Sequence, residues 1–228
     1  MSVVAMVPYW RDYTKLVSSH SPADSIEFQL SGKHVLNYVL SSLKNVGLID
    51  DIVLFSSEHS IELKLDDGLG YTFCKRPTYL DAPDIRIEDI IYEFVSSVKS
   101  DYIVLAHPNC PFLTINTIIE CIECVTSEKS CFDSAFVAQE VQRLAWFRSK
   151  PLNYSLSNKT PHSENLDPII IECSALYVFP RQLFLDTGSR IGKAPYIKIV
   201  DQFEGLTLTS KEDAELAELV IDSGMVKH

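Results

Sequence analysis

"LSGKHVLNYVLSSLKNVGLIDDIVLFSSEH" (residues 30–59) has the pattern of an amphipathic helix followed by a buried strand, and this order decides the fold class. In the first half, apolar residues recur at helical spacing up to Gly47, where a helix is expected to end; they are Val35, Leu36, Tyr38, Val39, Leu43 and Val46. In the second half, residues 50–57 contain a continuous apolar run, which is typical of a strand covered on both faces. A helix that leads into such a strand indicates one unit of a parallel sheet.

The same alternation extends outward in both directions. Residues 2–9 precede the helix as a first buried strand. We expect further strands at 70–77, 101–106, 132–141 and 169–180, and helices at 85–100, 114–128 and 210–224. Ser210 is placed to cap the last helix, whose first turns are acidic. The sequence therefore predicts a single α/β domain over residues 1–228, Rossmann-like, with a mostly parallel sheet and helices on both faces.

Length and charge limit what such a domain does. The chain has 228 residues, of which 46% are hydrophobic and 22% charged, as in ordinary soluble globular proteins. Its net charge of -11 argues against a general nucleic-acid binder, but not against binding one nucleotide in a locally positive pocket. The apolar runs are strand-sized, and the N-terminus lacks the pattern of a signal peptide. We therefore expect a cytoplasmic protein that binds neither nucleic acid nor a membrane.

The six cysteines are expected to be reduced thiols, since nothing in the sequence indicates export. Cys121 and Cys124 form a C-x-x-C, but they fall on a predicted helix whose apolar stripe includes Ile118, Cys121 and Val125. No second C-x-x-C or histidine pair completes a zinc site in the sequence. We interpret both cysteines as small apolar residues of that helix.

The candidate site follows from the predicted sheet. In an open parallel sheet, ligands bind beyond the carboxyl ends of the strands. Three polar segments begin at such ends: "PYWRDYTK" (8–15), "SSEH" (56–59) and "HPNCPF" (107–112). We expect these three loops to gather around one ligand.

Six stretches, in order and over nearly the whole chain, resemble motifs of the CMP-sialic acid synthetase family, the cytidylyltransferases that activate nine-carbon sugar acids. They are "PYWRDYTK" (8–15), the stretch 30–59, "KRPTYL" (75–80), "LAHPNCPFLT" (105–114), "ECSALYVF" (172–179) and "LTLTSKEDAELAE" (206–218). The resemblance implies a fold of the nucleotide-diphospho-sugar transferase type. It also implies transfer of CMP from CTP to a nonulosonic or ulosonic sugar acid for surface glycan synthesis, with Mg²⁺ as cofactor. A loop-rich, aromatic insertion at about 141–168 implies a homodimer, because in the family this region helps two subunits share a site.

The resemblance assigns roles to single residues. Arg11 and Lys15 correspond to catalytic cations of the opening loop, which grip the triphosphate. Four residues correspond to substrate-binding positions: Arg76, His107, Asn109 and Tyr177. The two aspartates that hold the metal in the family correspond to Thr207 and Thr209, which we expect to project from one face of a strand.

The chain departs from the family pattern at several of these places. The opening loop has no glycine, and a family arginine and glutamine on the acceptor side correspond to Ser163 and Glu164. Two neutral threonines are poor ligands for a hard dication, whose affinity depends on negative charge. Asp12, Asp84 or Glu204 could replace the lost carboxylates, and the sequence does not choose among them.

These departures leave three functions open. The first is the family reaction. The second is a catalytically silent paralogue that binds a nucleotide or nucleotide sugar and acts as a partner protein, which the lost aspartates favour. The third is a nucleotidyltransferase of related fold that uses another nucleotide, which the altered opening loop favours.

Overall fold

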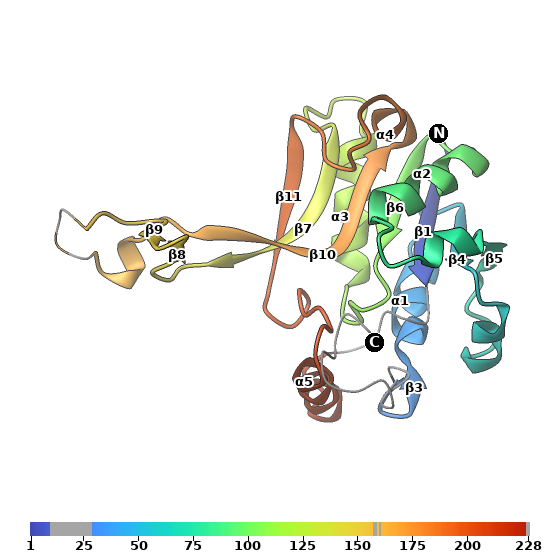
Figure 1. Cartoon of the computed structure of the whole chain (residues 1–228), viewed down its shortest axis with the longest axis horizontal. Helices are drawn as coiled ribbons and strands as arrows, with labels where there is room; N and C mark the ends of the chain where they lie inside the picture. Colours follow the sequence, from blue (N-terminus) through green and yellow to red (C-terminus); the bar gives the residue numbers. More distant parts are fainter. Residues whose placement is uncertain (10–28, 157–158, 160, 227–228) are drawn as a thin grey trace.

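The computed structural model describes residues 1–9, 29–156, 159 and 161–226, and within them a seven-stranded sheet forms the centre (Figure 1). The strand order is β11-β7-β10-β6-β1-β4-β5. The strands are β1 (Val3–Tyr9), β4 (Asp51–Ser56), β5 (Thr72–Lys75), β6 (Tyr102–Ala106), β7 (Ser134–Val141), β10 (Ile169–Pro180) and β11 (Pro195–Val200). The helices are α1 (Val35–Lys44), α2 (Ile87–Ser97), α3 (Ile115–Thr126), α4 (Arg181–Thr187) and α5 (Lys211–Asp222).

Strand direction agrees with the predicted sheet, with one reversal. β1 is parallel to β4 and β6, β4 is parallel to β5, and β11 is parallel to β7. β10 is antiparallel to both of its neighbours, β6 and β7. The prediction of a mostly parallel α/β sheet is confirmed, and the carboxyl ends of β1, β4, β5 and β6 share one edge.

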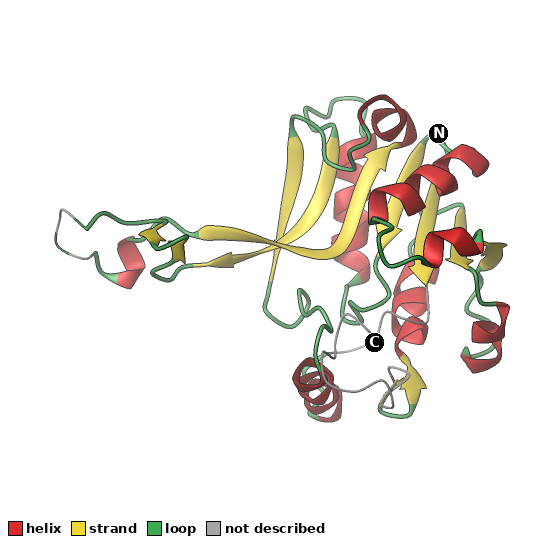
Figure 2. Ribbon diagram, in the orientation of Figure 1, coloured by secondary structure: helices red, strands yellow, loops and turns green. Residues whose placement is uncertain are grey.

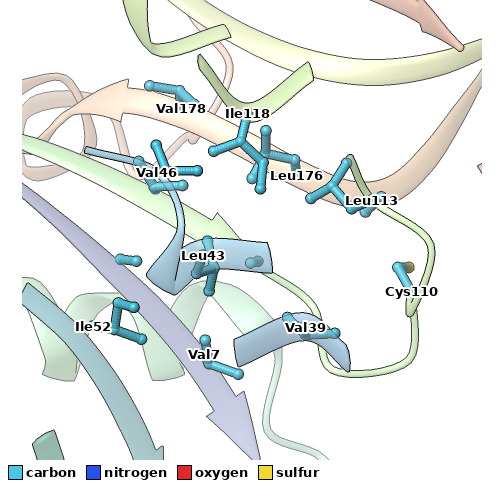
Figure 3. Close-up of a cluster of buried hydrophobic side chains, with 14 of the residues drawn as sticks. Val7, Val39, Leu43, Val46, Ile52, Cys110, Leu113, Ile118, Leu176 and Val178 are labelled. Atoms are coloured by element: carbon cyan, nitrogen blue, oxygen red, sulfur yellow. The ribbon is translucent and has the colours of Figure 1, made fainter. Parts of the chain in front are cut away.

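Helices cover both faces of the sheet, as predicted (Figure 2). Alternate side chains of β1 point to opposite faces, so Ala5 packs with Leu40 of α1, while Met6 lies in the cluster of Phe94 of α2. The face of Ala5 is closed by α1 and α3, and the face of Met6 by α2 and α4. Figure 3 shows the first cluster, where Leu43 and Ile118 lie over the strands. Within the described residues, no helix has the length and apolar character needed to cross a membrane.

A long arm leaves the sheet between β7 and β10 (Figure 1). It contains the short strands β8 (Trp146–Phe147) and β9 (Lys150–Pro151) and a 3₁₀ turn, η4 (Ser163–Asn165). The side-chain amide of Asn153 ties the arm together, since it donates to the carbonyl oxygens of Arg143 and Asp167 and accepts from the N–H of Ala145. The region expected to be loop-rich is therefore an extension of the sheet hairpin that is braced by side chains.

The C-terminal segment corrects one expectation. Residues 206–209 are irregular rather than a strand, and they pair with no strand of the described chain. The following helix, α5, is confirmed, and Ser210 and Asp213 form its capping box. Its buried face packs with Leu208 in a small cluster apart from the main core; the members are Leu30, Val35, Phe112, Leu208, Ala217 and Val220.

Candidate functional site

Loops that follow neighbouring strands begin side by side at the carboxyl edge of the sheet. Tyr9 at the end of β1 pairs in register with Ser56 at the end of β4, which pairs with Lys75 at the end of β5. The ring of Tyr9 lies edge-on to His34, the N-cap of α1, at 5.6 Å between centroids. This edge is where the topology predicts a ligand. The predicted catalytic cations Arg11 and Lys15, and Asp12 with them, fall outside the described residues.

Arg76 lies directly beyond β5, with a fully buried side chain. Its N–H donates to the carbonyl oxygen of Ser56 at 2.9 Å, which holds the loop against β4. Its guanidinium Nη2 forms an ion pair with Asp81 Oδ1, while Asp84 is exposed. Arg76, which we predicted to bind substrate, is thus a buried positive charge beside the carboxyl edge of the sheet.

His107 is the first residue after β6, and its imidazole is buried. The backbone N–H donates to the carbonyl oxygen of Ala175 at 3.1 Å, and the ring lies edge-on to Tyr177 at 6.1 Å. Burial, assisted by the charge of Arg190, lowers the pKa of His107 to about 3. The imidazole is therefore neutral near pH 7 and adds no positive charge at this edge of the sheet.

Tyr177 lies beside His107 and belongs to a charged network. Its hydroxyl donates to the carboxylate of Glu172, and burial followed by this contact raises its pKa to about 12. The guanidinium of Arg190 lies 4.3 Å from the centre of the tyrosine ring and pairs with Glu88 at 3.0 Å and Glu172 at 3.7 Å. The structure thus brings Tyr177 and His107 together.

Sequence reasoning missed three members of this network, Glu88, Glu172 and Arg190. Arg190 lies in the loop between α4 and β11, and no motif or spacing marks it. Ser174 adopts a positive φ of 55° inside β10, where the register shifts between Glu172 and Tyr177. This bulge places Glu172 and Tyr177, five residues apart, in contact, and alternation along a regular strand does not predict that.

Asn109 docks the C-terminal segment onto the loop after β6. Its carbonyl oxygen accepts from the N–H of Leu208 at 2.8 Å, and its side-chain Nδ2 donates to the carbonyl oxygen of Leu208 at 3.2 Å. The side chain of Leu208 is 1% exposed. The residue predicted to bind substrate therefore holds segment 206–209 in place.

Thr207 and Thr209, which we expected at the metal positions of the family that the sequence resembles, make hydrogen bonds within the chain. The hydroxyl of Thr207 donates to the carbonyl oxygen of Cys173 at 2.7 Å and lies 3.5 Å from the sulfur of Cys110. The hydroxyl of Thr209 donates to Oδ2 of Asp213 at 2.8 Å. Nearby Gly205 has no room for a Cβ, which would lie 2.9 Å from the sulfur of Cys173.

The described residues do not fit a magnesium site. Glu204 accepts from both the N–H and the hydroxyl of Thr114, at 2.9 and 2.8 Å, and thereby holds the N-cap residue of α3. Asp84 is exposed in the turn before α2. Within the described ranges, no group of three or more histidine, cysteine, aspartate or glutamate side chains is arranged to hold a metal ion. A dication of this class takes several oxygen ligands, which these residues do not supply.

Comparison with solved structures shows the fold of cytidylyltransferases. A CMP:2-keto-3-deoxy-manno-octonic acid synthetase complexed with CTP is similar at TM-score 0.69 and 12% identity, over 98% of this chain and 99% of that one. A 4-diphosphocytidyl-2C-methyl-D-erythritol synthase from Anaerococcus prevotii is similar at TM-score 0.61 and 11% identity, over 97% and 96%. A 2-C-methyl-D-erythritol 4-phosphate cytidylyltransferase from Thermus thermophilus is similar at TM-score 0.58 and 10% identity, over 97% and 100%. No protein-family model and no curated sequence matches the chain.

Proposed function

We propose that this chain binds CTP beyond the carboxyl ends of β1, β4 and β6 and transfers CMP to a sugar acid of the nonulosonic or ulosonic class for surface glycan synthesis. The observation that carries the proposal is the whole-chain likeness in fold to a synthetase solved with CTP. β1 lies between β4 and β6 and is parallel to both, so the loops that follow these three strands begin at the same edge. The six ordered sequence motifs favour an acidic sugar as acceptor.

The proposed reaction is a phosphoryl transfer. A hydroxyl oxygen of the sugar forms a bond to the α-phosphorus of CTP, the bond from that phosphorus to the bridging oxygen breaks, and pyrophosphate leaves while the hydroxyl loses its proton. Catalysis of this kind rests on positioning and charge neutralisation. Arg11 and Lys15 supply positive charge to the triphosphate, and neutral His107 supplies hydrogen bonds to the sugar or phosphate.

The test is release of pyrophosphate from CTP in the presence of a panel of nonulosonic and ulosonic acids. We expect turnover with at least one acid, and a loss of about 100-fold or more in kcat for Arg11→Ala and for Lys15→Ala, because each removes a charge from the reacting phosphates. Lys99→Ala, at an exposed lysine in the loop between α2 and β6, is the matched control and should retain full turnover. The absence of pyrophosphate release with every acid would refute the transfer reaction for these acceptors.

A second candidate is a silent nucleotide-binding protein that acts as a partner of another protein. The specific observation that favours it is the pair of threonine hydroxyls bonded inside the fold where the family has aspartates. Stabilisation of the chain by CTP without pyrophosphate release would identify this candidate. A ligand at about 100 times its Kd stabilises the native state by about 2.7 kcal/mol, so a thermal shift detects binding. A larger shift with another nucleoside triphosphate would indicate the third candidate.

We also propose that the chain forms a homodimer through the arm. Five large apolar residues of the arm are exposed by 47 to 68%: Leu144, Trp146, Phe147, Leu152 and Leu156. Apolar surface of this kind on a projecting element is typical of an interface. We expect light scattering to give twice the mass of the chain, and the double substitution Trp146→Ser and Phe147→Ser to give the single mass. Leu219→Ser, at an exposed leucine of α5, is the control; a monomeric wild type would contradict the prediction.

A further inference from the structure

Segment 204–213 contains Thr207 and Thr209, which by resemblance correspond to the family's metal aspartates, and it is bonded into the fold through its polar side chains. Glu204 receives two hydrogen bonds from Thr114, and Thr207 donates to the carbonyl oxygen of Cys173. Each of these contacts joins the segment to a residue distant in sequence. The polar side chains that could otherwise bind a ligand therefore already form hydrogen bonds to other parts of the fold.

The carboxylate of Asp213 likewise already accepts hydrogen bonds from within the chain. Its Oδ2 accepts from the N–H of Thr209 at 2.8 Å, the hydroxyl of Thr209 at 2.8 Å and the N–H of Ser210 at 2.9 Å. Burial acts to raise the pKa of Asp213, but these hydrogen bonds outweigh it and lower the pKa. This carboxylate forms the side-chain half of the capping box of α5, and its hydrogen bonds to Thr209 and Ser210 would be lost if it turned to a cation.

Packing fixes the segment against the sheet. Leu208 is buried among residues of α1, α5 and the loop after β6, and Asn109 holds its backbone by two hydrogen bonds. At Gly205 the backbone passes so close to Gln139 and Cys173 that a Cβ would lie 2.6 to 2.9 Å from their side chains. Releasing Thr207 would leave the carbonyl oxygen of the buried Cys173 without this donor, which is costly in a core.

From these contacts we infer that segment 204–213 works as a latch that docks α5, and that CTP binds to this chain without a divalent cation held by the segment. Any divalent cation that accompanies CTP is then carried by the nucleotide. The second clause rests on the proposed nucleotide site, whereas the first does not.

Three measurements test the latch and the nucleotide clause separately. In isothermal titration of wild type with CTP, we expect Kd values in Mg²⁺ and in EDTA to agree within about threefold, a difference of less than 1 kcal/mol. A loss of about tenfold or more in EDTA that Thr207→Val abolishes would overturn the nucleotide clause, because the cation would then depend on the segment, whereas a loss that the variant keeps would place the cation on the nucleotide. An absence of CTP binding in both buffers would overturn the proposed site together with that clause.

The latch is tested without nucleotide. When Mn²⁺ is titrated into the wild-type chain, its electron paramagnetic resonance spectrum should remain that of free Mn²⁺. A spectrum of bound Mn²⁺ in wild type that is lost in Thr207→Val would overturn the latch. We expect Thr207→Val to lower Tm by about 2 to 4 °C, as for one lost hydrogen bond in a chain of this size. Thr207→Ser keeps the hydroxyl and should restore Tm. A Tm of Thr207→Val equal to that of wild type would also overturn the latch.

Discussion

As pH falls below about 6.5, the free energy of unfolding of wild type should decrease more steeply than that of His107→Gln. The pKa of His107 in the folded chain is about 3, because of burial first and Arg190 second, whereas an unfolded histidine titrates near 6.5. Between these two values the unfolded state binds a proton that the folded state does not, so stability is lost as pH falls. Each pH unit costs about 1.4 kcal/mol, or about 2.7 kcal/mol at pH 4.5.

Urea unfolding at about pH 7, 5.5 and 4.5 measures this difference, since glutamine at position 107 keeps a polar side chain but does not titrate. His162→Gln, at an exposed histidine of the arm, is the control and should follow wild type. Parallel curves for wild type and His107→Gln would show that the imidazole takes up its proton in the folded chain. A confirmed difference would establish that the imidazole of His107 is neutral in the folded chain at neutral pH.

Periodicity was sufficient to predict the parts of the fold where burial follows a regular pattern. The stripes of α1, α2 and α3 face the sheet because apolar residues at intervals of three and four share one face of a helix, and the structure buries those residues. Cys121 is buried in that stripe, as predicted, and all six cysteines are free thiols. The reversal of β10 was not predictable, because an apolar run of residues indicates a strand without giving its direction.

The prediction of a strand at 206–209 was wrong for a physical reason. Leu206 and Leu208 alternate with Thr207 and Thr209, which is also the pattern of a strand with one buried face. Here Leu208 is buried in a side cluster beside α5, and the backbone of Leu208 bonds to Asn109 instead of a sheet neighbour. Local alternation cannot distinguish these cases, because the partner of the segment lies about a hundred residues away in the chain.

The positions of Arg76 and His107 at the sheet edge were predictable, but their charge states and partners were not. Strand ends located Arg76 and His107 at the carboxyl edge, since parallel strands bring their ends together. The charge state of His107 depends on burial and on Arg190, and the placement of Arg190 depends on a loop that no pattern marks. Which groups are neutral and which are paired is therefore decided by tertiary contacts that a single sequence does not reveal.

Asp81→Asn should destabilise the chain more than other substitutions of surface carboxylates, by about 2 to 3 kcal/mol. The guanidinium of Arg76 is 0% exposed and its partner Asp81 35% exposed, so the pair is buried at the arginine. Removing one partner of a fully buried pair costs about 3 to 5 kcal/mol, and the partial exposure of Asp81 reduces this value. Urea unfolding at neutral pH measures the change, with exposed Asp84→Asn as the control, for which we expect less than about 0.5 kcal/mol.

A double substitution separates the buried charge from other effects of Asp81→Asn. Arg76→Met combined with Asp81→Asn removes the cation and fills its volume with an apolar side chain, so we expect it to regain part of the lost stability. A double variant less stable than Asp81→Asn would mean that the guanidinium is stabilised mainly by other contacts.

If the phosphates of CTP reach Arg76, CTP should raise the Tm of Asp81→Asn more than that of wild type, because the ligand then supplies the missing negative charge. Equal increases in Tm for the two proteins would mean that Arg76 does not contact the nucleotide and has a structural role at the carboxyl edge of the sheet.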